Sequence, residues 1–282
     1  MEAKKHKPRK SLGQNFLKSE IALRKLVEAG EVTKDDTILE IGPGKGAITR
    51  KLLRYAGRVI AVEKDPYLVS FLREKFSDEV ASGQLILVEN DILDFEISKA
   101  FPEVFEWSGR GAGPRRTEDL RKNSEKRAYK IIANIPYNIT GAILKKFLTE
   151  THQPSLMVLL VQHEVAKRIV ARDKKESILS ISVKSYGKPS MIDKVPARYF
   201  SPSPKVDSAI IKIADISRDF FIKNEVDEEK FWEIVKKGFA HKRKKLSGNL
   251  KNAFSDEKKI NKELGDKRAE DITLLDWIFL AK

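Results

Sequence analysis

The sequence predicts an α/β fold. We expect a mainly parallel sheet of the nucleotide-binding type, followed by a small all-α C-terminal domain. Short β-rich runs alternate with helical periodicity up to about residue 215. The first of these runs ends in a glycine-rich turn that leads into a helix, as at the start of a nucleotide-binding sheet. From residue 216 the pattern is helical only. We therefore expect two domains, residues 1–215 and residues 216–282.

The composition favours a negatively charged partner. The chain has 282 residues, and its 55 Lys and Arg against 41 Asp and Glu give a formal net charge of +14. Such an excess favours nucleic acid, although a solvated, lysine-rich surface would have the same composition. Cysteine is absent, which excludes disulfides and cysteine-based metal sites and fits a cytoplasmic location.

The same composition gives no indication of a metal or a membrane. The four histidines do not pair at ligand spacing, so we expect no metal. No apolar run reaches membrane-spanning length, and the basic N-terminus lacks the apolar region of a secretory signal. We therefore expect a soluble, cytoplasmic protein with no membrane partner.

The N-terminal region carries two candidate binding segments. Residues 1–10 are rich in Lys and Arg, and they indicate either an arm that touches phosphates or a merely disordered tail. The segment Gly13-Gln14-Asn15-Phe16-Leu17 places two amides beside an aromatic ring, just ahead of a helical pattern over residues 21–27. Such side chains can hold a ligand, but the segment alone proves little.

The turn Gly42-Pro43-Gly44-Lys45-Gly46 follows the β-rich run Thr37–Ile41 and precedes a helical pattern. Glycine lets the backbone adopt positive φ and approach a ligand closely. A phosphate-binding P-loop needs Gly-Lys followed by Ser or Thr, whereas Gly46 follows Lys45 here. A dinucleotide fingerprint needs Gly-x-Gly-x-x-Gly, which the turn does not match. The turn is closer to those of methyltransferases than to those of dehydrogenases.

Two further predicted strands lead to carboxylates. Residues 58–62 are followed by Glu63, a candidate acceptor for both ribose hydroxyls, a role found in NAD enzymes and S-adenosylmethionine enzymes alike. Residues 84–88 lead to Asp91, which can accept a hydrogen bond from an adenine amine while the backbone near Ile92 reads the ring edge. Alternatively, Asp91 is a helix cap or a turn residue.

The stretch Asn134-Ile135-Pro136-Tyr137 follows an apolar run, Tyr129–Ala133, that we interpret as the end of a buried strand. Pro136 has no amide hydrogen and cannot continue a ladder, and the residue before it is pushed toward an extended conformation. The Ile135 carbonyl and the Asn134 side chain then lie together as two acceptors, which suit an NH2 group. Tyr137 offers a flat face to a planar base. An ordinary turn after a strand is the alternative.

The rest of the chain continues the alternation after an interruption. Residues 102–127 show little apolar periodicity, and we interpret them as a flexible insertion that either helps to grip RNA or has no function. Helical patterns over 140–148 and 180–186 alternate with strand patterns over 156–161 and 188–195. A proline-locked loop, residues 199–208, leads into a strand over 209–213. Phe200 at the mouth of this loop is a candidate second stacking face.

The C-terminal residues carry a dense basic block. Phe231, Ile234, Val235 and Phe239 lie on one helical face, and a last helix is predicted over 272–280. Between them, Lys242, Arg243, Lys244 and Lys245 form a candidate RNA contact, with a solvated helix face as the alternative.

Taken together, these motifs resemble the small-subunit ribosomal RNA adenine dimethyltransferase family (the KsgA type). The resemblance runs from about Ser11 to the C-terminus, and the insertion at 102–127 departs from the family's short connection. The matching segments, in the family's order, are Gly13-Gln14-Asn15-Phe16-Leu17, Glu40-Ile41-Gly42-Pro43-Gly44-Lys45-Gly46, Val62-Glu63-Lys64-Asp65, Asn90-Asp91-Ile92-Leu93, Asn134-Ile135-Pro136-Tyr137-Asn138-Ile139, Phe200 to Ser208, and the C-terminal basic helix Phe239 to Leu246.

The resemblance implies a seven-stranded Rossmann-like methyltransferase sheet with its last strand antiparallel, and a helical C-terminal domain that binds RNA. It implies a monomeric enzyme that uses S-adenosylmethionine to dimethylate the exocyclic amines of two adjacent adenosines. These adenosines would lie in the 3′-terminal hairpin loop of 16S rRNA, in an immature 30S-type particle during ribosome biogenesis. The cofactor residues by motif match are Asn15, Leu17, Gly42, Glu63, Asp91 and Asn134, with Gln14 and Ile92 added; residues 134–137 would be catalytic, and no metal is implied.

Three other functions stay open at this point. The erythromycin-resistance type dimethylates one large-subunit rRNA adenosine with the same pocket, although Pro43 and the Pro-Ser-Pro-Lys loop favour the small-subunit type. A ribosome-assembly checkpoint, with methylation secondary, is the second. An NAD-dependent oxidoreductase is the third, and residues 134–137 and the basic C-terminal domain argue against it.

Overall fold

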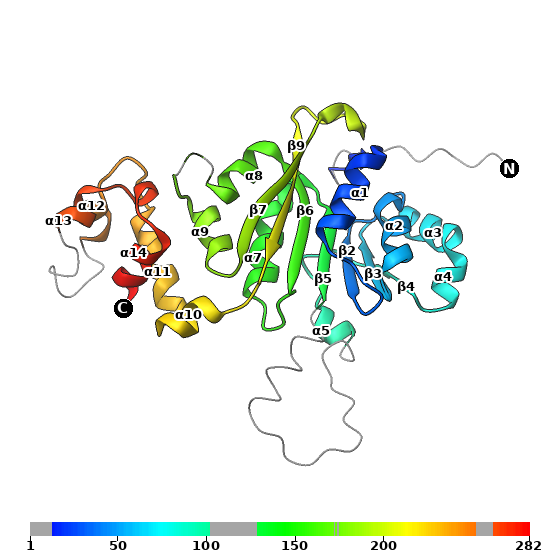
Figure 1. Cartoon of the computed structure of the whole chain (residues 1–282), viewed down its shortest axis with the longest axis horizontal. Coiled ribbons are helices and arrows are strands. Elements are labelled where there is room, and N and C mark those ends of the chain that lie inside the picture. Colours follow the sequence, from blue (N-terminus) through cyan, green and yellow to red (C-terminus); the bar gives the residue numbers. More distant parts are fainter. Residues whose placement is uncertain (1–12, 102–128, 172, 174, 252–261) are drawn as a thin grey trace, which may run out of the picture.

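A seven-stranded sheet forms the centre of the molecule (Figure 1). The computed structural model describes residues 13–101, 129–171, 173, 175–251 and 262–282, so the predicted basic arm and the 102–127 insertion lie outside the described residues. The strand order is β4-β3-β2-β5-β6-β9-β7. The strands are β2 (Thr37–Ile41), β3 (Arg58–Glu63), β4 (Leu85–Glu89), β5 (Lys130–Asn134), β6 (Leu156–Gln162), β7 (Lys188–Val195) and β9 (Ser208–Ala214).

The sheet is parallel over five strands and antiparallel at one edge. All neighbours from β4 to β6 run parallel, whereas β9 runs antiparallel to both β6 and β7. The predicted seven-stranded sheet with an antiparallel last strand is therefore confirmed. Because the parallel strands end at one edge, the residues that follow β2, β3, β4 and β5 meet there, as in other open α/β sheets.

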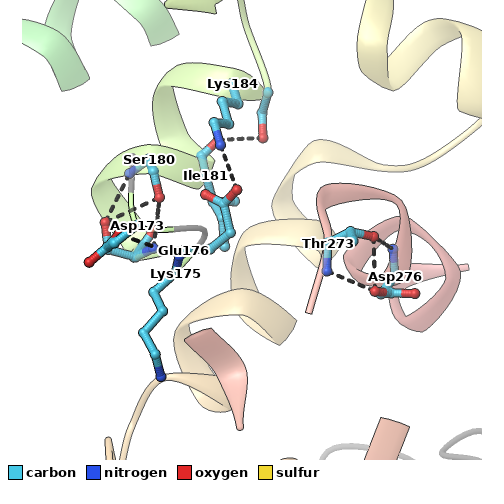
Figure 2. Close-up of polar contacts among 10 residues, drawn as sticks. Asp173, Lys175, Glu176, Ser180, Ile181, Lys184, Thr273 and Asp276 are labelled. Atoms are coloured by element: carbon cyan, nitrogen blue, oxygen red, sulfur yellow. Dashed lines mark hydrogen bonds and ion pairs between the residues drawn. The ribbon is translucent and has the colours of Figure 1, made fainter. Parts of the chain in front are cut away.

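Helices follow most strands, and from α10 onward every described element is helical. N-terminal caps position several of them: Asp65 caps α3, and Ser177 and Thr273 form capping boxes at α9 and α14. Figure 2 shows the Thr273–Asp276 pair at the start of α14. The helices are α1 (Glu20–Ala29), α2 (Ala47–Tyr55), α3 (Pro66–Lys75), α4 (Ser77–Ala81), α5 (Ile97–Ala100), α7 (Thr140–Thr149), α8 (His163–Val170), α9 (Ile178–Lys184), α10 (Asp219–Asn224), α11 (Glu228–Gly238), α12 (Leu246–Leu250), α13 (Lys262–Asp266) and α14 (Leu274–Ala281).

Two hydrophobic cores cover the two faces of the sheet. Alternate strand residues point to opposite faces, so Ile38 packs with α1 and α2 on one side while Leu39 joins α7 on the other. The core on the α7 side of the sheet is continuous with the core of the helical C-terminal part, and it includes Phe221, Phe231 and Trp277. The C-terminal helices, at one end of the molecule in Figure 1, are thus packed against the part of the chain that holds the sheet, where Phe221 contacts Tyr186 after α9.

Polar contacts reinforce this junction. Arg218 donates to the carbonyls of Thr149 and Glu150 at the end of α7 and pairs with Glu228 of α11. Lys175 pairs with Glu270 at 2.6 Å. Lys184 pairs with Glu176, as Figure 2 shows. Within the described ranges, no helix combines the length and the apolar character needed to cross a bilayer.

The predicted element boundaries differ from the structure by one or two residues. The helix expected at 180–186 runs from Ile178 to Lys184, since Ser177 caps it. The basic helix that the resemblance implies over Phe239 to Leu246 is absent from the structure, because residues 239–245 form the bends and turns that connect α11 to α12.

Candidate active site

A cavity of about 540 Å³ opens where the parallel strands end. The glycine-rich turn, the ends of β3, β4 and β5, and residues 13–18 line it. The structure brings together in its wall every predicted cofactor and catalytic residue: Gln14, Asn15, Leu17, Gly42, Glu63, Asp91, Ile92, Asn134, Ile135, Pro136 and Tyr137.

The glycine-rich turn needs glycine at three positions. Gly42, Gly44 and Gly46 all have positive φ, between 58° and 75°. A Cβ on Gly44 would lie 2.9 Å from the Phe16 ring, and one on Gly46 would lie 2.5 Å from Phe76. Gly42 differs, since a Cβ there would meet no atom within 4 Å. Its open side faces the cavity, which lets a ligand approach the backbone closely.

Glu63 ties the turn to the end of β3. Its Oε2 accepts a hydrogen bond from the Gly44 amide at 3.1 Å and its Oε1 one from the Asp65 amide at 3.0 Å. The side chain is 7% exposed, and burial raises the pKa of the carboxyl. Each carboxylate oxygen can accept more than one hydrogen bond, so both remain able to receive a ligand hydroxyl.

Asp91 is a turn residue whose carboxylate also lines the cavity. Its Oδ1 accepts the Leu93 amide at 3.0 Å, as a turn residue does. Its Oδ2 accepts from Lys64 Nζ at 2.6 Å, and this hydrogen bond lowers the pKa of Asp91. The carboxylate is therefore ionised at neutral pH, and it lines the cavity next to the buried side chain of Ile92.

Residues 13–18 close one side of the cavity. Strand β1 (Phe16–Leu17) pairs antiparallel with β8 (Phe200–Ser201), which fixes the segment against the proline-rich loop. The Asn134 side chain donates its Nδ2 to the Asn15 carbonyl at 2.9 Å. Since the amide nitrogen has this partner, the hydrogen-bonding pattern assigns Oδ1 of Asn134 as the free acceptor.

The stretch Asn134 to Tyr137 begins at the last paired residue of β5. Asn134 pairs with Leu160 of β6. Ile135 follows this last paired residue, so its carbonyl lies beyond the paired part of the strand. Pro136 is extended, with φ −60° and ψ 132°, and Tyr137 opens a short 3₁₀ turn. The Tyr137 hydroxyl forms a 2.6 Å hydrogen bond with Ser208 Oγ, and burial raises the pKa of the phenol.

The structure does not support Phe200 as a second stacking face. Its side chain is 4% exposed and belongs to the core between the sheet and α1. The pairing of Phe200 with Leu17 turns the ring inward, so Ser201 rather than Phe200 reaches the cavity. Only the tertiary pairing reveals this, because two-residue strands leave no pattern in the sequence.

Some functional features were missed from the sequence. Asn138, Leu68 and Ser201 also line the cavity, and Lys64 neutralises Asp91. Opposite charges at neighbouring strand ends were the available signal for that ion pair. Another missed feature is the larger groove, about 1710 Å³, between the sheet and the helical part, with Lys145, Arg168, Lys236 and Lys242 in its wall.

The basic block divides in the structure. Lys242, Arg243, Lys244 and Lys245 are all exposed, but Lys245 forms an ion pair with Asp266 at 2.8 Å. Over the described parts of the chain, no cluster of three or more His, Asp and Glu side chains could hold a metal ion.

Comparison with known protein families gives one match over nearly the whole chain. The model of the family described as ribosomal RNA adenine dimethylase matches residues 5–281. A protein of Dehalococcoides mccartyi named ribosomal RNA small subunit methyltransferase A is 37% identical over 284 residues, which cover 98% of this chain and 88% of that protein. A protein of the same name from Fusobacterium nucleatum is 35% identical, with 99% and 97% covered.

Solved structures share the fold. A dimethyladenosine transferase from Plasmodium falciparum superposes with a TM-score of 0.71 at 24% identity, covering 94% of this chain and 95% of its own. The 23S rRNA methyltransferase ErmE gives a TM-score of 0.70 at 23% identity, covering 94% and 98%. The predicted Rossmann-like methyltransferase fold is thereby confirmed.

Proposed function

This chain belongs to the ribosomal RNA adenine dimethylase family, and from that premise we propose the reaction it carries out. The protein is an rRNA adenine dimethyltransferase. It uses S-adenosylmethionine to place two methyl groups on the exocyclic amine of each of two adjacent adenosines in the 3′-terminal hairpin loop of 16S rRNA. The observation that carries the proposal is that Asn134, Ile135 and Tyr137 share one cavity with the glycine-rich turn.

The residues of the cavity fit the cofactor. The open side of Gly42 accommodates a ligand against the backbone, Glu63 has acceptors for ribose hydroxyls, and the ionised Asp91 accepts from an adenine amine. Gln14, Asn15, Leu17 and Ile92 complete the wall. When bound, S-adenosylmethionine supplies a methyl group on a positively charged sulfur that leaves as a neutral thioether.

The adenine amine is a weak nucleophile because its lone pair is delocalised into the ring. Asn134 and Ile135 counteract this delocalisation. Hydrogen bonds from its two N–H groups to Asn134 Oδ1 and the Ile135 carbonyl favour a pyramidal nitrogen with a localised lone pair. Positioning and electrostatics then supply most of the rate. The nitrogen becomes acidic once it gains a methyl group, so it releases one proton without a strong base.

The target base must leave its stack to enter the cavity. Tyr137 replaces the stacking that the base gives up, an interaction of about 1–3 kcal/mol per base. The monomethylated amine retains a single N–H, so the second transfer proceeds with one of the two acceptors.

RNA binding is assigned to basic side chains of both parts of the chain. The exposed Lys242, Arg243 and Lys244 contact phosphates, and Lys145 and Arg168 face the same groove from the sheet side. The proposal includes residues 1–215 as the catalytic domain and residues 216–282 as the RNA-binding domain. The enzyme acts as a cytoplasmic monomer on an immature 30S-type particle during ribosome biogenesis.

One experiment tests the proposal. The protein is incubated with methyl-labelled S-adenosylmethionine and, in parallel reactions, with unmethylated small subunits or unmethylated large-subunit rRNA, and the labelled nucleotides are mapped. We expect N6,N6-dimethyladenosine at two adjacent positions near the 3′ end of the small-subunit rRNA. Label on large-subunit rRNA instead would favour the single-adenosine type of enzyme, and no label on either RNA would refute the assignment.

A further inference from the structure

The strand β9 begins with a serine that contacts the aromatic ring of the site. Ser208 Oγ lies 2.6 Å from the Tyr137 hydroxyl, and its side chain is fully buried. Tyr137 is only half-buried, and it lines the cavity. The one polar atom of the Tyr137 side chain is therefore bound to a group that has no contact with solvent.

Ser208 is itself held rigidly. It lies opposite Gln162 in the pairing of β9 with β6 and opposite Val195 in the pairing of β9 with β7. The residue before it, Asp207, accepts the His163 amide on its carbonyl at 2.9 Å and the Ala197 amide on its carboxylate at 3.0 Å. A hydrogen bond to so fixed a point restricts the Tyr137 ring to one orientation before any base arrives.

We propose that Ser208 is a positioning residue that preforms the Tyr137 stacking face, and that this role weighs most in the second methyl transfer. The proposal rests on the function proposed above and names a residue that it did not include. In the first transfer, the adenine amine has two N–H groups for Asn134 Oδ1 and the Ile135 carbonyl. In the second it has one, so the stacked ring carries a larger share of the orientation.

The product ratio is the readout that separates positioning from general stability. Ser208→Ala is expected to lower the rate of the second transfer about fivefold relative to wild type, the size that fits the removal of one hydrogen bond. The first transfer falls less, so N6-monomethyladenosine accumulates at the expense of N6,N6-dimethyladenosine. A reduced stability alone lowers both rates by the same factor and leaves the ratio unchanged.

A second variant tests the same contact from the other side. Tyr137→Phe retains the ring and removes the hydroxyl, so it is expected to shift the product ratio as Ser208→Ala does. Combining the two is expected to add nothing, since both remove one hydrogen bond. Ser185→Ala is the matched control, because Ser185 is equally buried but donates to the Ile181 carbonyl in α9.

The outcomes separate the inference from the function on which it rests. The inference is overturned if Ser208→Ala and Tyr137→Phe leave the ratio at the wild-type value, or if their effects add in the double variant. If Ser208→Ala does not fold, Tyr137→Phe alone decides by the same ratio. If the wild-type protein produces no methylated adenosine in either rRNA, the proposed function is refuted. That result differs from a wild-type product ratio in the variants, which overturns the inference alone.

Discussion

At the scale of single residues, polar groups of the site are fixed by hydrogen bonds within the protein and still have acceptors for a ligand. The Asn134 side chain donates a hydrogen bond from Nδ2 to the Asn15 carbonyl, and its Oδ1 remains available as an acceptor. Glu63 binds two backbone amides and still has lone pairs for a ligand. The residue types could be predicted from the sequence, but the partners could not, because Asn15 and Asn134 meet only in the folded chain.

Glu40 is a buried carboxyl that the proposed mechanism does not use. It lies in β2, just before the glycine-rich turn, and neither of its oxygens has a hydrogen-bond partner within the described residues. Burial raises the pKa of Glu40 to about 8. The folded protein therefore holds this proton at pH 7, where the unfolded chain, with a pKa of about 4.3, has released it.

This difference predicts a pH-dependent stability. Between about pH 4.3 and 8 the folded state binds more protons at Glu40 than the unfolded state, so the contribution of Glu40 to the free energy of unfolding falls as pH rises. Glu40→Gln, which carries no titrating group, is expected to show a smaller fall in Tm from pH 5 to pH 8. Equal falls in both proteins, measured by thermal unfolding, would contradict this account of Glu40.

At the scale of elements, the strand, glycine-rich turn and helix from Thr37 to Tyr55 were predictable because their pattern is local. The pairing of β1 with β8 was not, since two-residue strands have no periodicity to detect. That missed pairing explains why Phe200 is buried rather than exposed at the cavity. The basic block was misassigned as helical because charged runs carry no signal that separates a helix from a turn.

Alanine substitutions at two glycines that have the same φ test how tightly the glycine-rich turn is packed. Gly46 and Gly83 both have a φ of 75°, but only Gly46 has atoms in the way of a Cβ, at 2.5 Å from Phe76. Gly83→Ala is expected to cost about 1–2 kcal/mol from left-handed backbone strain. Gly46→Ala carries the same strain and a further cost of about 1–3 kcal/mol from overpacking.

Urea unfolding of the two variants measures these costs. The expected order is wild type, Gly83→Ala, then Gly46→Ala, with a clear gap between the variants. Equal unfolding free energies for the two variants would show that α3 yields to the added methyl group and that the turn is not tightly packed.

At the scale of the whole molecule, the part of the chain that holds the sheet and the helical C-terminal part share a continuous core. The helical part packs through Phe221 against Tyr186, which follows α9, and Lys242 lies at the groove that both parts line. The sequence predicted an appended helical domain, but not the groove, which depends on how the two parts pack together.

Salt dependence tests the role of the basic block in RNA binding. Lys242→Ala, Arg243→Ala and Lys244→Ala are each expected to reduce the slope of log affinity against log salt by about 0.7–0.9 for each phosphate that the variant no longer neutralises. Lys245→Ala is the matched control, since Lys245 is paired with Asp266 and should change the slope less. If the slopes of these variants all equal the wild-type slope, the exposed lysines and arginine are not part of the interface.

The central claim is that Asn134 and the Ile135 carbonyl hold the adenine amine for methyl transfer in the cavity beside the glycine-rich turn. The most direct measurement is the single-turnover rate of Asn134→Ala at saturating RNA and S-adenosylmethionine. We expect a fall of roughly 100-fold or more, the size seen when one preorganised polar group is removed, with RNA affinity unchanged. Wild-type turnover in this variant would contradict the claim.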